Sequence, residues 1–258
     1  MKRSAMAILA GLLSLSVPTH ASLSDGLVAY FAFEGNAADS SGNANDGVAF
    51  GGVSFESGVI GSAARFDGST GYVASNSSVG NLGSDATIAF WLRPEASSLA
   101  SATRIFEKDN RAYWWFATGG GVNVSLRGLN SYGPPQTSVT VGDPADLALK
   151  WSHIAMRETG GTMDVFLDGD LVSSVPTPVT SVVTDAPLYF GKSYYWNTFY
   201  YAGLVDEARI YNRGLSNAEL RELALRDQTL VPEPATIVLL LSGLVAFRLS
   251  ARRPSAFG

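Results

Sequence analysis

The chain has 258 residues, a net charge of -5 and no cysteine. The absence of cysteine excludes disulfide bonds, thiol catalysis and zinc–thiolate sites. No basic patch is interleaved with aromatic residues, so the composition also argues against a nucleic-acid partner.

The N-terminus has the pattern of a secretory signal peptide. Lys2 and Arg3 form a basic region, an apolar run from Ala5 to Val17 follows, and Thr19-His20-Ala21 fits a cleavage site. This order is typical of a segment that directs export and is then removed. We therefore predict a signal peptide over residues 1–21 and a mature chain that begins at Ser22.

The body of the chain, residues 22–228, is long enough for one well-buried domain and has the pattern of β-strands. Apolar and polar residues alternate in short runs rich in Val, Ile, Phe, Tyr and Thr, separated by Gly, Asn, Asp or Ser. The clearest predicted strands are 27–33, 87–92, 113–118, 122–127, 152–157, 163–167 and 204–211. Asp168-Gly169, between two such runs, predicts a two-residue hairpin turn.

One segment has a helical pattern, from Ser216 to Leu225. Ser216 and Glu219 have the spacing of a capping box, and the apolar stripe consists of Leu220, Leu223 and Ala224. Many strands and one terminal helix predict an all-β fold, a two-sheet antiparallel jelly-roll sandwich.

The loop from Asp39 to Gly47 is dense in side-chain oxygens. They belong to Asp39, Ser40, Asn43, Asn45 and Asp46. Calcium takes six to eight oxygen ligands at roughly 2.3–2.6 Å, and a glycine-rich loop can direct its carbonyls toward such an ion. The alternative is an Asn/Asp turn without an ion, because these residues favour turns by themselves.

Catalytic patterns are weak. His153, the histidine of the mature chain, lies in an apolar strand and is expected to be structural. Asp206 and Glu207 are adjacent, so a strand would direct them to opposite faces. Glu107 and Asp109 alternate, but a charged turn after Phe106 explains them better. A retaining glycosidase needs two carboxyl groups about 5–5.5 Å apart. No predicted strand carries two alternating acidic residues that would meet this need, so we expect a protein that is not an enzyme.

Aromatic residues cluster in two places. Residues 194–201 contain six rings in a polar loop, and Tyr113-Trp114-Trp115-Phe116 directs rings to both faces of one strand. Exposed flat rings beside amides suit sugars, so Trp114, Tyr195 and Trp196 are the predicted ligand contacts. The alternative is that the rings pack within the protein, which we expect for Phe116 and Tyr201.

The last residues, 229–258, contain Pro232-Glu233-Pro234, an apolar run over 235–247, and Arg248, Arg252 and Arg253. This tail resembles the PEP-CTERM sorting signal of Gram-negative bacteria. The resemblance implies recognition and cleavage by an exosortase-type membrane protease, and display at the cell surface or in an extracellular matrix. The apolar run is shorter than the about 20 residues of a full span, which suits transient contact with the inner membrane.

Seven stretches, in order, resemble the LamG-like jelly roll of the concanavalin A-like lectin and glucanase group. They lie within residues 26–36, 39–47, 64–73, 87–94, 151–155, 165–169 and 203–216. The resemblance implies that residues 64–73 form a hairpin. In this group calcium commonly lies where the first loop meets the closing strand. The resemblance therefore adds Asp206 to Asp39, Asn43 and Asp46 as expected ligands of a structural calcium ion.

These patterns together predict an exported, surface-sorted, non-catalytic protein that binds an extracellular polysaccharide. Two alternatives stay open. One is a structural or adhesion protein of the matrix that binds protein partners, and the other is a glycoside hydrolase.

Overall fold

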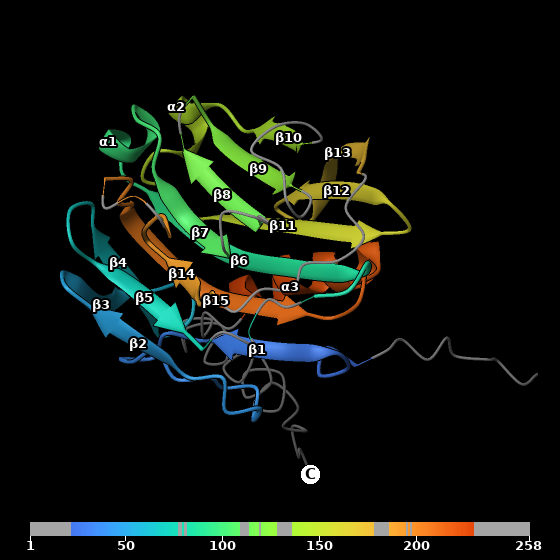
Figure 1. Ribbon diagram of the computed structural model, residues 1–258, viewed down its shortest axis with the longest axis horizontal. Coiled ribbons are helices and arrows are strands. Elements are labelled where there is room, and N and C mark those ends of the chain that lie inside the picture. Colours follow the sequence, from blue (N-terminus) through green and yellow to red (C-terminus); the bar gives the residue numbers. More distant parts are fainter. Residues whose placement is uncertain are drawn as a thin grey trace, which may run out of the picture.

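A computed structural model describes residues 22–76, 79, 82–108, 114–118, 120–127, 136–177, 186–194, 196 and 198–229. The predicted signal peptide and the predicted sorting tail, with Pro232, Glu233 and Pro234, lie outside the described residues. Two antiparallel sheets pack face to face, which confirms the predicted jelly-roll sandwich (Figure 1).

The first sheet has eight strands and contains the closing strand β15. Its order is β13 (Asp170–Pro176), β12 (Thr162–Leu167), β11 (Ser152–Thr159), β6 (Ala86–Pro94), β15 (Ala202–Tyr211), β4 (Ser62–Asp67) and β3 (Val53–Ser57). Strand β1 (Leu27–Phe31) also pairs with β15, beyond the residues that pair with β4. The predicted hairpin turn joins β12 to β13, with positive φ values of 51° at Asp168 and 85° at Gly169.

The second sheet has seven strands. Its order is β10 (Gln136–Val141), β9 (Val122–Arg127), β8 (Trp114–Thr118), β7 (Arg104–Lys108), β14 (Leu188–Phe190), β5 (Tyr72–Ser75) and β2 (Gly47–Phe50). The seven strands predicted from the alternation are all present, with boundaries shifted by a few residues.

The core lies between the sheets and is rich in phenylalanine. Phe106 and Phe190 from the seven-stranded sheet meet with their ring centroids 5.3 Å apart, and Phe106 stacks on Phe90 from the eight-stranded sheet. All three side chains are fully buried. Removing one such ring would cost about 3–5 kcal/mol, so this layer holds the two sheets together.

Two interpretations of local sequence are wrong. Residues 64–73 match a family hairpin, but β4 pairs within the eight-stranded sheet and β5 within the seven-stranded sheet. The turn between them crosses from one sheet to the other, and the carboxylate of Asp67 accepts the backbone N–H groups of Ser69, Thr70 and Gly71. Glu107 is a residue of β7 and is not part of a charged turn.

The chain forms three helices in its described part, where one was predicted. The two additional ones are single turns, α1 (Ala96–Leu99) and α2 (Pro144–Leu147). In α2 the side chain of Asp143 caps the first turn, accepting a hydrogen bond from the N–H of Ala145. Turns this short carry no amphipathic period, which is why the sequence pattern did not reveal them.

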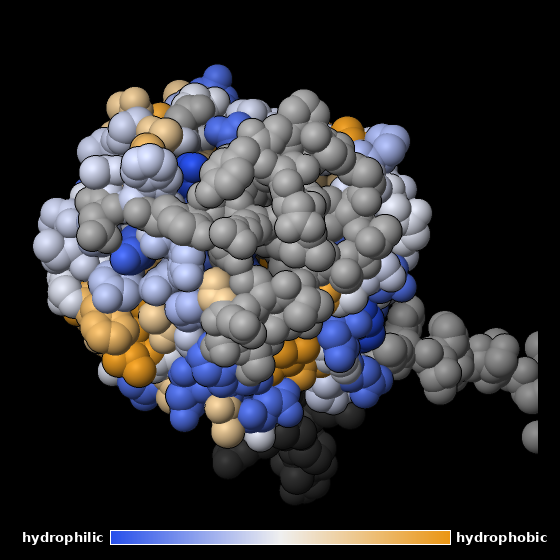
Figure 2. All heavy atoms as spheres, in the orientation of Figure 1, coloured by the Kyte–Doolittle hydropathy of each residue, from blue (hydrophilic) through white to orange (hydrophobic). Residues whose placement is uncertain are grey.

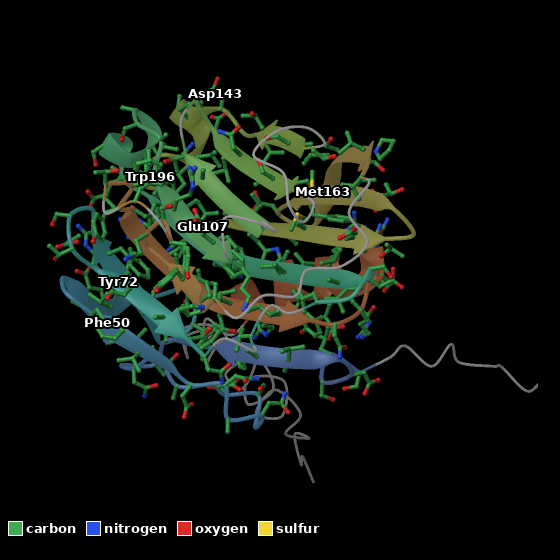
Figure 3. All side chains as sticks on the ribbon, in the orientation of Figure 1. Phe50, Tyr72, Glu107, Asp143, Met163 and Trp196 are labelled. Atoms are coloured by element: carbon green, nitrogen blue, oxygen red, sulfur yellow. The ribbon has the colours of Figure 1, made fainter. Side chains whose placement is uncertain are left out.

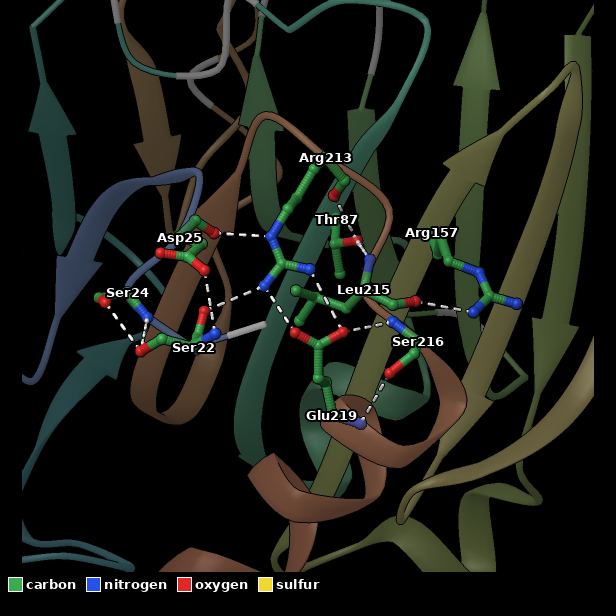
Figure 4. Close-up of polar contacts among 9 residues, drawn as sticks. All are labelled: Ser22, Ser24, Asp25, Thr87, Arg157, Arg213, Leu215, Ser216 and Glu219. Atoms are coloured by element: carbon green, nitrogen blue, oxygen red, sulfur yellow. Dashed lines mark hydrogen bonds and ion pairs between the residues drawn. The ribbon is translucent and has the colours of Figure 1, made fainter. Parts of the chain in front are cut away.

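The predicted helix is α3 (Asn217–Thr229), and it covers the outer face of the eight-stranded sheet. Leu220, Leu223 and Ala224 are buried there. The capping box forms as predicted: Ser216 N–H donates to Glu219 at 2.7 Å, and Glu219 N–H donates to Ser216 Oγ at 3.3 Å. Figure 4 shows that Arg213 also binds the Glu219 carboxylate, tying the helix to the end of β15.

Within the described residues, the helices are too short or too polar to cross a membrane. The predicted apolar segment 235–247 is not among those residues.

Candidate functional site

The outer face of the seven-stranded sheet carries a row of aromatic rings. Val73 of β5 and Phe190 of β14 are fully buried and point into the core. Since side chains alternate along a strand, their neighbours Tyr72 and Tyr189 point outward, where both are half-buried. The outward face of this sheet is thus partly aromatic instead of uniformly polar.

Four rings make up this aromatic row: Phe50, Tyr72, Tyr189 and Tyr194. Successive ring centroids are 4.8 Å apart from Phe50 to Tyr72, 5.8 Å from Tyr72 to Tyr189, and 5.9 Å from Tyr189 to Tyr194. Figure 3 shows Phe50 and Tyr72 beside each other, and Figure 2 shows hydrophobic atoms gathered over β2, where Val48 and Phe50 are exposed. The row is long enough to contact several rings of an extended ligand.

A loop between β14 and β15 closes one end of the row. Its two ends meet, because Tyr201 N–H donates to the carbonyl of Gly191 at 3.0 Å. Arg104 N–H donates to the carbonyl of Phe199 at 2.9 Å, and the Arg104 guanidinium lies 5.3 Å from the Phe199 ring. The loop from Gly191 to Tyr201 is therefore fastened to β7 by backbone and side-chain contacts.

Glu107 on β7 is the buried anchor of this loop. Its Oε1 accepts hydrogen bonds from Tyr194 N–H at 2.9 Å and from the Ser193 hydroxyl at 3.1 Å, and its Oε2 accepts one from Arg104 at 2.9 Å. Burial raises the pKa of Glu107, although these hydrogen bonds and the charge of Arg104 oppose the shift. A single carboxylate thus sets the position of Tyr194 at the end of the row.

The three predicted ligand contacts have different outcomes. Trp196 lies on the fastened loop and is 60% exposed. Tyr195 lies outside the described residues. Trp114 is the first residue of β8, paired in register with Leu126, and its side chain is likewise outside what the structure describes. Tyr201 is fully buried with its ring centroid 6.1 Å from that of Phe66, so the packing prediction for Tyr201 is confirmed.

The sequence did not identify Phe50, Tyr72 and Tyr189 as members of one site. A signal was present in the alternation, because Tyr189 lies between the apolar Leu188 and Phe190 and Tyr72 precedes the apolar Val73. The alternation shows that each tyrosine points outward. It cannot show that β14 and β5 are neighbours in the sheet, and this pairing brings the rings together.

The predicted calcium loop, residues 39–47, forms hydrogen bonds along the edge of β1 that does not pair with β15. The carboxylate of Asp39 accepts hydrogen bonds from the backbone N–H groups of Tyr30, Ser41 and Asn45 and from the Ser41 hydroxyl. Asn43 donates to the carbonyls of Leu27 and Val28. An unpaired strand edge invites aggregation, and these polar side chains cover it. The bonds to N–H groups hold the pKa of Asp39 below its usual value even though burial opposes this.

Asp206 has other partners. It is fully buried at the point where β15 changes its neighbour from β4 to β1. Its carboxylate accepts the N–H groups of Val59, Ile60 and Glu207. Burial raises the pKa of Asp206 to about 7, with a further contribution from the nearby Glu207 and against the effect of these hydrogen bonds.

The oxygens of Asp39 and Asp206 thus accept hydrogen bonds from backbone N–H groups. Asp46 likewise accepts the N–H of Asp39 at 2.8 Å. Among the described residues, no group of three acidic or histidine side chains is arranged to hold a metal ion. Calcium binding stays a prediction, and the hydrogen bonds give these residues a structural role that needs no ion.

Replacing Asp39 by alanine is expected to lower the free energy of unfolding by about 1–3 kcal/mol, because several donors lose a charged acceptor. Thermal unfolding should show this loss in chelator as well as in calcium. Equal melting temperatures of wild type and variant in chelator would contradict the hydrogen-bonding role. A melting temperature that falls on chelation in the wild type alone would establish an additional role for the ion.

His153 and Glu158 are buried titratable groups that lie away from the aromatic row. His153 is buried beside Trp91, which confirms its structural interpretation, and burial lowers its pKa to about 3. Glu158 on β11 is fully buried, and its carboxylate has no hydrogen-bond partner. Burial, with a smaller contribution from Asp85, raises the pKa of Glu158 to about 8.

Comparison with models of known protein families identifies the superfamily of this chain. The family model of the concanavalin A-like lectin/glucanases superfamily matches residues 67–221. The chain belongs to this superfamily. A search of curated protein sequences finds no match.

Several solved structures have a fold similar to that of this chain. One is domain 4 of AbnA, a GH43 extracellular arabinanase from Geobacillus stearothermophilus, in complex with arabinotriose; it is 22% identical, with a TM-score of 0.62, 77% of this chain and 98% of that domain being covered. The binding domain of Paraclostridial Mosquitocidal Protein 1 is 18% identical with a TM-score of 0.67, and 79% of this chain and 52% of that one are covered. The receptor binding domain of botulinum neurotoxin C/D mosaic serotype is 16% identical with a TM-score of 0.66 and has the same coverage. The chain spans about half the length of the two toxin domains, and at these identities the likeness concerns the fold.

Proposed function

We propose that this protein is a non-catalytic carbohydrate-binding jelly roll whose ligand lies along the aromatic row and against Trp196. The observation that carries the proposal is the row itself: four outward rings in contact, continued by a loop that Glu107 fastens in place. The apolar face of a sugar ring packs on an aromatic ring while its hydroxyls bond to the polar rim. A row on a rigid sheet is ordered before binding, which lowers the entropic cost of association.

The family and one structural neighbour support a sugar as the ligand. The superfamily includes lectins, and the arabinanase domain was solved with arabinotriose. Because the arabinanase domain has a similar fold and was solved with a sugar, glycans are the first ligand class to test. Fold alone does not determine function, so the proposal depends on the rings.

Three observations support the absence of catalysis. Both oxygens of Glu107 accept hydrogen bonds, and those of Asp206 accept three N–H groups. Glu158, with its raised pKa, is closed off from solvent. A glycosidase needs an accessible pair of carboxyl groups flanking the bond that is cleaved.

Replacing Trp196 by alanine is expected to weaken glycan binding by about 1–2 kcal/mol, or about five- to thirtyfold in Kd. The melting temperature should stay nearly unchanged, because the side chain is mostly exposed. Binding measured by calorimetry with polysaccharide fragments, together with thermal unfolding, tests this. Leu171→Ala, which removes a 48% exposed side chain on β13 of the other sheet, is the matched control. Unaltered affinity in the Trp196 variant would count against the site.

A protein partner is the second candidate, and the edge strand β2 favours it. Val48 and Phe50 are 56% and 41% exposed on this strand, and exposed apolar residues at one edge suit a protein contact. A glycan array separates the two candidates. A glycan-binding surface should give a signal with the wild type that Trp196→Ala abolishes, whereas a protein-binding surface should give no such signal.

We also propose that the protein is exported and sorted to the surface of a Gram-negative cell, where it associates with exopolysaccharide or biofilm matrix. The support comes from the sequence of residues 1–21 and 229–258. Mass spectrometry of the surface protein is expected to find an N-terminus at Ser22 and a C-terminus near Pro234, because an exosortase-type protease would cut close to the Pro-Glu-Pro motif. Surface protein that ends at Gly258 would contradict this sorting route.

A further inference from the structure

A lysine lies in the middle of the aromatic row. The Nζ of Lys192 is 4.5 Å from the ring centroid of Tyr72 and 5.1 Å from that of Tyr189. Phe50 continues the row beyond Tyr72, and Tyr194 continues it beyond Tyr189. The ammonium group therefore has ring surfaces on both sides, and a ligand along the row would pass over it.

The environment of Lys192 strengthens its charge interactions. The side chain is half-buried, and burial lowers its pKa while the charge of Glu107 opposes this shift. Glu107 itself is held beneath the loop by Arg104, Ser193 and the Tyr194 N–H. A charge beside apolar rings is screened less than one in bulk water, so an anion placed there gains more.

We propose that Lys192 makes the aromatic row selective for acidic sugars, with the carboxylate of a uronic acid residue bound by the ammonium group while neighbouring sugar rings pack on Phe50 and Tyr194. This inference rests on the proposed function and adds the class of glycan to it. The cation–π contacts hold the ammonium in position before the ligand arrives, and an ammonium is a compact donor of three hydrogen bonds. A row of rings alone would select for sugar faces and not for charge.

The test uses polysaccharides that differ only in charge. Polygalacturonate and alginate are each compared with their methyl esters, which keep the sugar rings and lose the anion. Binding to the full-length mature protein is measured by calorimetry in chelator, so that calcium cannot bridge the carboxylates, at low salt and again at high salt. We expect at least one of the two acids to bind about tenfold more tightly than its ester at low salt, the contribution of a partly desolvated ion pair. High salt should reduce the difference.

Two variants show whether Lys192 is responsible. Lys192→Met keeps an apolar chain over the rings and should bring the ratio of the acid affinity to the ester affinity close to one. Lys150→Met is the control, because Lys150 is exposed on the α2 side of the molecule, 3.9 Å from Asp146, and should behave as wild type.

The outcomes separate this inference from the proposed function. Equal affinity for acid and ester, or a preference that survives Lys192→Met, overturns the inference and leaves glycan binding intact. Failure of both forms and of neutral glycans to bind overturns the proposed function as well.

Discussion

Glu107→Ala is expected to lower the free energy of unfolding by about 3–5 kcal/mol, the usual cost of breaking a buried ion pair by removing one partner. Arg104, whose side chain is only 14% exposed, would lose this carboxylate, and the Ser193 hydroxyl and the Tyr194 N–H would lose their acceptor. The loop from Gly191 to Tyr201 should loosen, so glycan affinity should fall together with stability. Chemical unfolding gives the energy, and hydrogen exchange of the loop amides gives the local effect.

Glu56→Ala is the control for this experiment. Glu56 is also a glutamate in an ion pair, 3.6 Å from Arg65, but its side chain is 52% exposed. Exposed pairs contribute about 0–1 kcal/mol, so this variant should be close to wild type. A Glu107 variant with wild-type stability and wild-type exchange rates in the loop would show that the loop is held by its backbone bonds alone.

Glu158→Gln is expected to stabilise the protein by about 2–3 kcal/mol at pH 8, after allowance for relaxation of the protein and entry of water around a buried charge. The folded pKa of Glu158 is raised to about 8 from an ordinary value near 4.5. Between these two values the folded state keeps a proton that the unfolded state has released, so stability falls as pH rises through this window. Glutamine cannot ionise and escapes this loss.

The diagnostic measurement is the difference in unfolding free energy between Glu158→Gln and wild type at several pH values. It should be near zero at pH 4.5 and grow up to about pH 8. Asp206, whose pKa is also raised, is present in both proteins and cancels in the difference. Glu56→Gln, at an exposed site, should show no such trend. A difference that does not change with pH would mean that Glu158 is not titrating in this range.

Local patterns predicted the elements of this fold well. Alternation identified the strands, Asp168-Gly169 identified the β12–β13 turn, and Ser216 with Glu219 identified the start of α3. Each of these signals depends on residues close together in the chain, where backbone geometry and nearby side chains decide the structure. The interpretation of residues 64–73 as a hairpin failed, because nothing local distinguishes a turn within a sheet from one that crosses between sheets.

The candidate site was only partly visible in the sequence. A dense aromatic loop is a local signal, and it predicted an exposed ring at Trp196. Phe50 and Tyr189 were missed, because their proximity to Tyr72 depends on the pairing of β2, β5 and β14. The local sequence predicts a turn at Glu107, because its partners Ser193 and Tyr194 come from a segment far along the chain.

The sequence by itself determined a cysteine-free, all-β jelly roll with a capped terminal helix and a polar aromatic loop, because composition, alternation and capping act over short distances. The tertiary structure alone decided which outward rings form one row, where Lys192 lies on it, and which carboxylates are bound to N–H groups. The physical reason is that a strand's own residues set which face each side chain takes, whereas pairing between distant strands sets which side chains become neighbours on that face.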